Sequence, residues 1–264
     1  MREDLPSTGG VQGMKLLLTE DGERADLRGA FVVEASPGPG AAGAIALNYL
    51  VESLNPLKLG EVRSPYFPHI SLVDEGVAMP PKIELYLYDG GESKLVIILR
   101  NFPVDSSEGS YLIARELYKF LRERGATSYC LLSSSRITGE AGVYVASSNP
   151  EDARIFLNSG ARLSPSLETL PVDKLSSYML MLYSREGGSA CVLISEVLSY
   201  FPDPMAAKRL LEVLSKALGF EVNLDRLDKE IEKQKRMLEE LQRGYGQLFP
   251  PKEEKPTKEP FYIG

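Results

Sequence analysis

Histidine, cysteine and tryptophan are scarce in this sequence of 264 residues, which has one His, two Cys and no Trp. Because His69 is the only histidine, any reaction that needs a histidine general base has to use it, and any metal site has to be built from carboxylates. Cys130 and Cys191 stand alone in the sequence rather than in closely spaced pairs. This spacing excludes a disulfide framework and a cysteine zinc site, and we expect both to be small buried apolar residues in a reducing compartment.

Long apolar runs are missing as well. None approaches the roughly 18 residues that a membrane span needs, so no membrane partner is predicted. The first residues include Arg2, Glu3 and Asp4 and lack the apolar segment of a secretory signal, which predicts a cytoplasmic protein. The net charge of -7 comes from 37 acidic and 30 basic residues. This balance argues against a nucleic-acid partner, because phosphate binding needs clustered Lys and Arg.

Alternating apolar segments and turns predict a single α/β domain over residues 29–219, after an N-terminal extension, residues 1–28, with a short edge strand at 14–18. Residues 30–35 read as an apolar strand, and a loop rich in Pro and Gly leads from it into a helix at 41–54. Further strands are predicted at 82–88, 95–99, 129–132, 143–146 and 190–194. Further helices are predicted at 113–121, 151–158, 175–183 and 204–218.

The segment 220–248 has the character of a separate helix with a heptad pattern. Its apolar positions form a seam that includes Leu227, Ile231, Leu238 and Leu241. Such a seam needs a partner, and two interpretations stay open: the helix packs back on the α/β domain, or it associates with a second copy. Residues 249–264 contain four Pro among Lys and Glu and too little apolar material to fold, so a flexible tail is predicted, ending in Phe261, Tyr262, Ile263 and Gly264.

A glycine-rich turn follows the first apolar strand. Gly38, Gly40 and Gly43 match the spacing G-x-G-x-x-G at the start of a helix, a pattern that can hold a dinucleotide phosphate. Pro37 and Pro39 flank Gly38 and each removes a backbone donor, and the segment around Glu61, where a ribose-binding acid is expected, does not end a clear apolar strand. A nucleotide- or nucleoside-binding enzyme or sensor is therefore the alternative hypothesis. The other interpretation is a sharp turn with close helix packing.

Hydroxyl side chains offer no catalytic set. Ser133, Ser134 and Ser135 are expected just past a buried strand, and Ser106 and Ser107 follow another, but no G-x-S-x-G motif is present. His69 lies between apolar residues and is expected to be structural, and the carboxylates are scattered through charged helices. No catalytic residue, metal site or cofactor is predicted from these patterns.

Several segments resemble, in order, the proteasome-assembly-chaperone type 2 family. The first is the turn and helix 36–50, with its P-G-x-G turn and the residues Asn48, Tyr49 and Leu50. The others are 64–68, 76–80, 83–88, 95–99, 111–125 and 203–207. The similarity covers about residues 29–243. The region after Gly160 departs from it, since residues 170–174 stand where the family usually has another glycine-rich turn.

The resemblance implies a phosphorylase/hydrolase-like α/β fold, with a mixed sheet flanked by helices, no catalytic centre, and a homo-oligomer that acts on the proteasome core particle. It also implies a C-terminal motif of a hydrophobic residue, a tyrosine and one further residue, which inserts between α subunits of the core particle. Phe261, Tyr262 and Ile263 match this motif. Gly264 follows them, so Tyr262 is third from the end rather than penultimate. The resemblance therefore predicts a non-enzymatic chaperone with a partner-binding tail.

Overall fold

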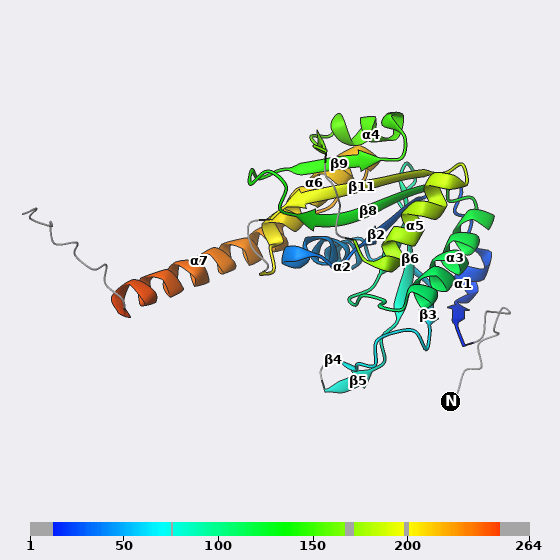
Figure 1. Cartoon of the computed structure of the whole chain (residues 1–264), viewed down its shortest axis with the longest axis horizontal. Coiled ribbons are helices and arrows are strands. Elements are labelled where there is room, and N and C mark those ends of the chain that lie inside the picture. Colours follow the sequence, from blue (N-terminus) through cyan, green and yellow to red (C-terminus); the bar gives the residue numbers. More distant parts are fainter. Residues whose placement is uncertain (1–12, 75, 167–171, 198–200, 249–264) are drawn as a thin grey trace, which may run out of the picture. The chain divides into compact units, whose positions relative to one another are not determined.

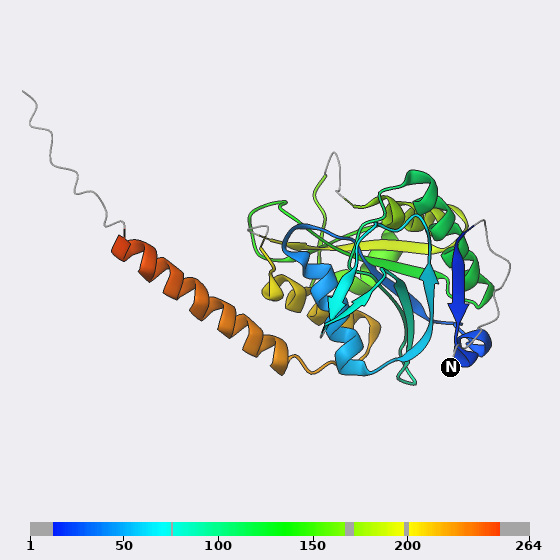
Figure 2. The same ribbon diagram turned by 90° about the horizontal axis from the view of Figure 1, so that it is seen from below.

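The computed structural model describes residues 13–74, 76–166, 172–197 and 201–248, with the backbone alone described at 72, 74 and 238–248. The chain divides into two compact units, Met1–Leu224 and Asp225–Gly264. Most of the described residues belong to the first unit, which contains a large sheet between two layers of helices (Figures 1 and 2).

One mixed sheet contains nine strands of the described chain, in the order β1-β3-β6-β7-β2-β8-β11-β9-β10. Their bounds are β1 (Lys15–Leu18), β2 (Phe31–Ala35), β3 (Leu57–Arg63), β6 (Ile83–Asp89), β7 (Lys94–Leu99), β8 (Ser128–Ser135), β9 (Val143–Ser147), β10 (Arg162–Leu163) and β11 (Ser189–Glu196). The central strands β7, β2, β8 and β11 are parallel, whereas β1, β3 and β6 form an antiparallel half beside β7. The mixed α/β fold predicted from the sequence is confirmed.

Helices cover both faces of the sheet. The described helices are α1 (Glu20–Arg24), α2 (Ala42–Leu54), α3 (Ser107–Glu123), α4 (Pro150–Leu157), α5 (Lys174–Arg185), α6 (Pro204–Leu218) and α7 (Asp225–Leu248), with a short 3-10 turn at Pro39–Ala41. Helices α3 and α5 pack together on one face, and α2 and α6 pack together on the other. The central strands are therefore buried on both sides, which explains why they read as continuous apolar runs.

Local signals in the sequence determine where several helices start and end. Asn149 caps α4 and Asp203 caps α6, each followed by a Pro at the first helical position. Gly219 ends α6 in the left-handed conformation, at φ 72°. The helix expected at 175–183 is α5, and the edge strand expected at 14–18 is β1, which pairs with β3.

Three features of the first unit differ from expectation. Residues 57–63 form β3, a strand inside the antiparallel half, although this segment lacks a clear apolar strand pattern. A second, two-stranded sheet is formed by β4 (Leu72–Asp74) and β5 (Val77–Met79). The serines expected in a loop after a strand lie instead within β8, where Ser133 and Ser134 are buried. Partners distant in sequence form β3 and extend β8, whereas β4 and β5 pair with each other across a short turn.

The second unit is described over α7, so the C-terminal helix predicted from the heptad pattern is present. Ion pairs along it join Arg226 to Glu230 and Lys235 to Glu232. The segment 249–264, which carries the predicted tail, lies outside the described residues.

Candidate functional site

The carboxyl ends of β7, β2, β8 and β11 meet at one edge of the sheet, where open α/β sheets place their ligand sites. We call this the carboxyl edge. Arg100 follows β7, the glycine-rich turn follows β2, the loop 136–141 follows β8, and Glu196 ends β11. The contacts of these four features decide what the edge can do.

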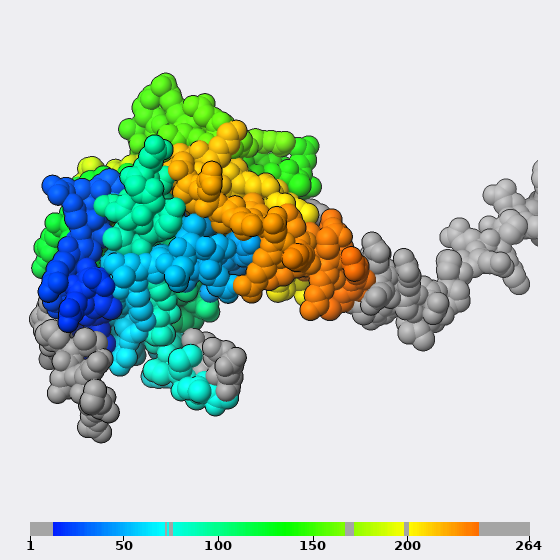
Figure 3. All heavy atoms as spheres, turned by 180° about the vertical axis from the view of Figure 1, so that it is seen from behind, coloured from blue at the N-terminus to red at the C-terminus, as the bar shows by residue number. Residues whose placement is uncertain are grey.

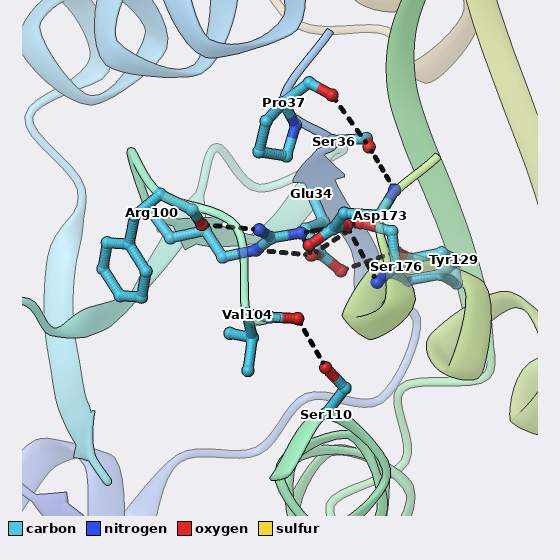
Figure 4. Close-up of polar contacts among 10 residues, drawn as sticks. Glu34, Ser36, Pro37, Arg100, Val104, Ser110, Tyr129, Asp173 and Ser176 are labelled. Carbon is cyan, nitrogen blue, oxygen red and sulfur yellow. Dashed lines mark hydrogen bonds and ion pairs between the residues drawn. The ribbon is translucent and has the colours of Figure 1, made fainter. Parts of the chain in front are cut away.

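A buried ionic network connects three elements at this edge (Figure 4). Arg100 donates to Oε1 of Glu34 on β2 from Nε at 3.0 Å and from Nη2 at 2.8 Å. Its Nη2 also lies 2.7 Å from Oδ1 of Asp173, the residue that caps α5. The Arg100 and Glu34 side chains have no exposed surface, and that of Asp173 is 9% exposed. One cation therefore faces two carboxylates in the interior.

Neutral groups complete the network. Tyr129 on β8 donates its hydroxyl to Oε2 of Glu34 at 2.6 Å, and Ser176 on α5 donates to Oε1 at 3.1 Å. Arg100 also donates to the carbonyl of Phe102 at 2.8 Å. Of the described side-chain atoms in this network, Asp173 Oδ2 is the one without a hydrogen-bond partner. The network joins β2, β8 and α5 to the segment that directly follows β7.

Burial determines the protonation of this network. It raises the pKa of Glu34, because desolvation outweighs the attraction of Arg100. Burial alone would lower the pKa of Arg100, but Glu34 and Asp173 outweigh it and the pKa is raised. Burial and the nearby Glu34 carboxylate raise the pKa of Tyr129 well above its usual value. Arg100 is therefore a permanent cation and Tyr129 a permanent donor, held by internal partners rather than turned toward a ligand.

The glycine-rich turn packs against the chain itself. Gly40 and Ala41 adopt left-handed conformations, at φ 67° and 48°. The Gly40 carbonyl accepts from the Asp203 amide at 2.8 Å, and Ser134 donates its hydroxyl to the Pro39 carbonyl. These contacts hold the turn between β8 and the start of α6.

Close packing accounts for two glycines of the G-x-G-x-x-G pattern. A Cβ atom at Gly43 would stand 2.7 Å from the Leu132 carbonyl oxygen, and one at Gly38 would stand 3.2 Å from Ser134 Oγ. These positions favour the interpretation of Gly38, Gly40 and Gly43 as a structural turn. Glu61, expected near the ribose of a nucleotide, is on β3 in the antiparallel half, where Lys58 and Arg63 pair with it.

The Glu196 carboxylate binds the backbone of the loop that follows β8. Its carboxylate accepts from the amides of Ile137, Thr138 and Gly139 at 3.0 to 3.1 Å. The Glu196 side chain is buried. Successive backbone amides of this kind form a nest that binds anions, and here the anion is a side chain of the same chain.

The structure does not bring His69 to the serines. His69 is exposed in the segment between β3 and β4, and three strands separate β3 from β8, which contains Ser133 and Ser134. Within the described ranges, no group of three or more His, Cys, Asp or Glu could hold a metal ion. None of the described helices carries an apolar stretch that could span a bilayer.

The two cysteines are neighbours, which the sequence interpretation missed. Cys130 on β8 and Cys191 on β11 stand directly opposite each other in the parallel pair, and both are buried free thiols. Both cysteines are buried, as expected. They are far apart in the sequence but adjacent in the folded sheet. Burial raises the pKa of Cys191 well above its usual value, so the thiol stays protonated and unreactive.

The remaining candidate residues lie in or beyond α7. Leu227, Ile231, Leu238 and Leu241 are all within this helix. Their use as an oligomer or packing seam stays a prediction. Phe261, Tyr262, Ile263 and Gly264 lie outside the described residues.

The ionic network itself was not predicted. Glu34 is the one charged residue in the strand Phe31–Ala35, and Arg100 follows the apolar strand Lys94–Leu99 directly. A lone carboxylate in a strand buried on both faces requires a partner of opposite charge, so these two residues carried a signal. Asp173 could be predicted as a helix cap, but its approach to Arg100 depends on the fold.

A family model described as the PAC2 family matches residues 32–242. An uncharacterized protein of Methanocaldococcus jannaschii, MJ1210, is 26% identical over 244 residues, which cover 88% of this chain and 91% of that protein.

Two solved structures from Pyrococcus furiosus are similar to this one. PbaB, an archaeal proteasome activator, is 23% identical, with a TM-score of 0.77 over 88% of this chain and 100% of that chain. PbaA, an archaeal homolog of proteasome-assembly chaperone, is 25% identical, with a TM-score of 0.73 over 90% of this chain and 94% of that chain.

Proposed function

This chain belongs to the PAC2 family, and from that premise we propose that it is a non-enzymatic, self-associating chaperone that acts on the proteasome core particle. The observation that carries the proposal is the family match over residues 32–242, together with the similarity to PbaA, the homolog of a proteasome-assembly chaperone. Both comparisons extend over most of the α/β unit.

The carboxyl edge supports a binding role rather than a catalytic one. The Arg100 guanidinium is held by Glu34 and Asp173, and the anion nest after β8 is filled by Glu196. The backbone of the glycine-rich turn contacts Ser134 and Asp203. Polar groups that a substrate or phosphate would need are thus already bound by the protein's own side chains. Partner recognition is then a matter for its surfaces and its C-terminal segment.

In the proposed mechanism, the segment 249–264 tethers a short aromatic motif to an oligomeric body. Phe261 and Tyr262 would enter pockets between α subunits of the core particle, since aromatic side chains bury a large area while losing few rotamers. Tethering raises the local concentration of the motif, and several copies on one oligomer bind together more tightly than one. Ile263 and Gly264 would complete the contact.

A pull-down of core particle tests this mechanism. We expect immobilised full-length protein to recover core particle, and the double variant Phe261→Ala/Tyr262→Ala and the 1–248 protein to recover much less. Lys258→Ala, in the same segment, is the matched control and should behave as the full-length protein. Equal recovery by the double variant removes the tail from the mechanism. Failure of the full-length protein to recover any core particle overturns the proposed function.

Self-association through α7 has its own test. If the seam joins copies, Ile231→Asp and Leu238→Asp lower the mass measured by light scattering. If the seam packs on the α/β unit instead, the mass stays the same and the unfolding free energy falls. Lys233→Asp, an exposed position on the same helix, is the control for added negative charge.

A further inference from the structure

A row of basic side chains crosses three strands in the antiparallel half of the sheet. Lys15 on β1 stands opposite Arg63, the last residue of β3, and Figure 3 shows β1 (dark blue) beside β3 (light blue) at the surface of the unit. Val62, the residue before Arg63, pairs with Ile83 on β6. Continuing that register places Arg63 beside Lys82, which directly precedes β6. We call these three cations the basic row. Like charges on neighbouring strands repel each other, so the row does not by itself stabilise the sheet.

Two carboxylates lie beneath these cations. Glu61 on β3 and Glu84 on β6 stand opposite each other, with side chains 14% and 18% exposed. Lys58 bridges them, at 3.3 Å from Glu61 and 2.7 Å from Glu84. Arg63 also pairs with Glu61, and Lys82 lies 2.9 Å from Glu84. Burial alone would raise the pKa of both carboxyl groups, but hydrogen bonds from these cations outweigh it, and both pKa values are lowered. Both groups therefore stay charged.

The cations on this face of the sheet outnumber its carboxylates. The basic residues are Lys15, Lys58, Arg63 and Lys82. They share two carboxylates, which leaves two positive charges in excess. Lys15 is exposed and forms no ion pair within the described ranges, and the Arg63 side chain is 62% exposed, above the more deeply placed Glu61. The whole chain has a net charge of -7, so a basic face on this acidic protein is complementary to an acidic partner.

A groove of about 280 Å³ lies at one end of the basic row. Arg63 is one of its lining residues, so the groove and the row are continuous. Its apolar walls include Phe67, Ile70, Pro65, Pro68, Pro80 and Pro81. Phe67 is held from behind by an edge-to-face contact with Phe102, at 4.9 Å between ring centroids, and the proline rings restrict the backbone around it. The groove is therefore preformed, and its size suits one apolar side chain.

We propose that the basic row and the groove together bind an acidic segment of a partner protein. One apolar side chain of the segment occupies the groove, and carboxylates next to it contact Lys15, Arg63 and Lys82. Glu61 occupies Nε and Nη2 of Arg63, so Nη1 remains open to a second carboxylate. The buried apolar side chain supplies most of the affinity, and the charges determine the direction in which the segment lies.

This surface is separate from α7 and from the tail, so it goes beyond the proposed function. A protein segment fits it better than a nucleic acid does, because the groove takes an apolar side chain and the two carboxylates beneath the cations oppose a run of phosphates. Binding at this surface is measured without core particle. Either proposal can therefore fail while the other stands.

Fluorescence anisotropy on the full chain tests the proposal with a labelled peptide in which one Leu stands between two pairs of Glu. We expect a Kd below about 1 mM at low salt, and weaker binding as salt is added. Two matched peptides separate the two contacts, one with Lys in place of Glu and one with Ser in place of Leu. Each should bind at least about fivefold more weakly. No binding of the first peptide, or equal binding of all three, overturns the proposal.

Two variants place the peptide on this surface. Lys15→Glu should weaken binding about fivefold, because it reverses a charge that has no carboxylate partner in the described chain. Its control is Lys119→Glu on α3, where the Lys119 side chain is 65% exposed. Ile70→Asp, which puts a carboxylate into the groove wall, should weaken binding at least as much. Its control is Leu163→Asp, at an exposed apolar residue on β10. Both controls should bind as the unchanged protein does.

Circular dichroism confirms that each variant is folded. Folded Lys15→Glu and Ile70→Asp proteins that bind the peptide as tightly as the unchanged protein overturn the proposal. Tighter binding of a single-stranded DNA of the same charge as the peptide also overturns it, because the surface is then a general site for anions rather than one for an acidic protein segment.

Discussion

The carboxyl edge of the central strands and the β4–β5 hairpin differ in the exposure of their side chains. At the edge, Glu34, Arg100 and Glu196 are buried and bound by other groups of the same unit. On the hairpin, Val73 and Val77 are 70% and 60% exposed. The usual ligand position of an α/β sheet is closed, and an apolar surface outside it is open. The comparison supports the proposal that this protein binds other macromolecules rather than a small ligand at the carboxyl edge.

This difference predicts that the buried groups at the carboxyl edge contribute mainly to the stability of the fold. Arg100→Met should lower the unfolding free energy by about 3 to 5 kcal/mol, because it leaves two buried carboxylates without their cation. Urea unfolding measures the loss. Arg28→Met is the control, since Arg28 pairs with Asp26 on the surface, where its side chain is 81% exposed, and the effect there should be far smaller. Equal losses of unfolding free energy in the two variants would contradict a stabilising role for the buried network.

The same variant carries a pH signature. The pKa of Glu34 is raised in the folded protein, so its contribution to stability is complete below the ordinary value of 4.5 and is lost as pH rises through the raised pKa. Arg100 is the group that draws this pKa down. We therefore expect the unfolding free energy of Arg100→Met to fall more steeply than that of the unchanged protein as pH rises above 4.5. If the unfolding free energies of the two proteins change in parallel with pH, Arg100 does not lower the pKa of Glu34.

Glu196→Gln tests whether the anion nest is filled from within. Its amide keeps the size of the carboxylate but loses the charge that three backbone amides bind, so we expect a loss of about 1.5 to 3 kcal/mol. Hydrogen exchange of the amides at 137–139 should become faster. Glu140→Gln, on the same loop with its side chain 76% exposed, is the matched control. Unchanged protection at 137–139 would mean that Glu196 does not close this loop.

Gly43→Ala tests the structural interpretation of the glycine-rich turn. The added methyl group would meet the Leu132 carbonyl oxygen at 2.7 Å, and we expect a loss of about 1 to 3 kcal/mol in unfolding free energy. Gly142→Ala is the control, because the nearest atoms to its Cβ position are 3.9 Å away. If Gly43→Ala is as stable as the control, close packing does not explain this glycine.

The last prediction is that nucleotides do not change the thermal stability of the protein. A ligand at 100 times its Kd would raise the unfolding free energy by about 2.7 kcal/mol, which a thermal shift detects. We expect no shift with millimolar NAD or a purine nucleoside, since the turn after β2 is held by Ser134 and Asp203. A clear shift would support the alternative of a nucleotide- or nucleoside-binding protein and would reopen the carboxyl edge as a ligand site.

Sequence patterns predicted the parts of the fold that depend on local signals. Continuous apolar runs identified β2, β7 and β11, and caps such as Asn149 and Asp203 located helix starts. The strand β3 was missed because Lys58, Gly60 and Glu61 break its apolar pattern, and pairing with β1 and β6 forms it instead. The hairpin was missed because its described side chains at Val73, Val77 and Ala78 are exposed, so burial imposes no alternation on them.

The candidate site was harder to predict because its partners come from distant segments. Glu34 lies on β2 and Arg100 directly follows the neighbouring strand β7, 66 positions away in the sequence, and the cap residue Asp173 reaches them from the start of α5. The pairing of Cys130 with Cys191 likewise depends on β8 and β11 being adjacent. The order of strands in a sheet cannot be read from any single segment of the sequence. The sequence could therefore show that a buried Glu34 requires a cation, but not which cation it pairs with.

The central claim, that this PAC2 family protein binds the proteasome core particle rather than a small-molecule substrate, is tested most directly by native mass spectrometry of the full chain with and without core particle. We predict an oligomer alone, and with core particle a complex whose mass equals the core particle plus whole oligomers of this chain. A spectrum in which the two proteins remain separate at micromolar concentration would contradict the account.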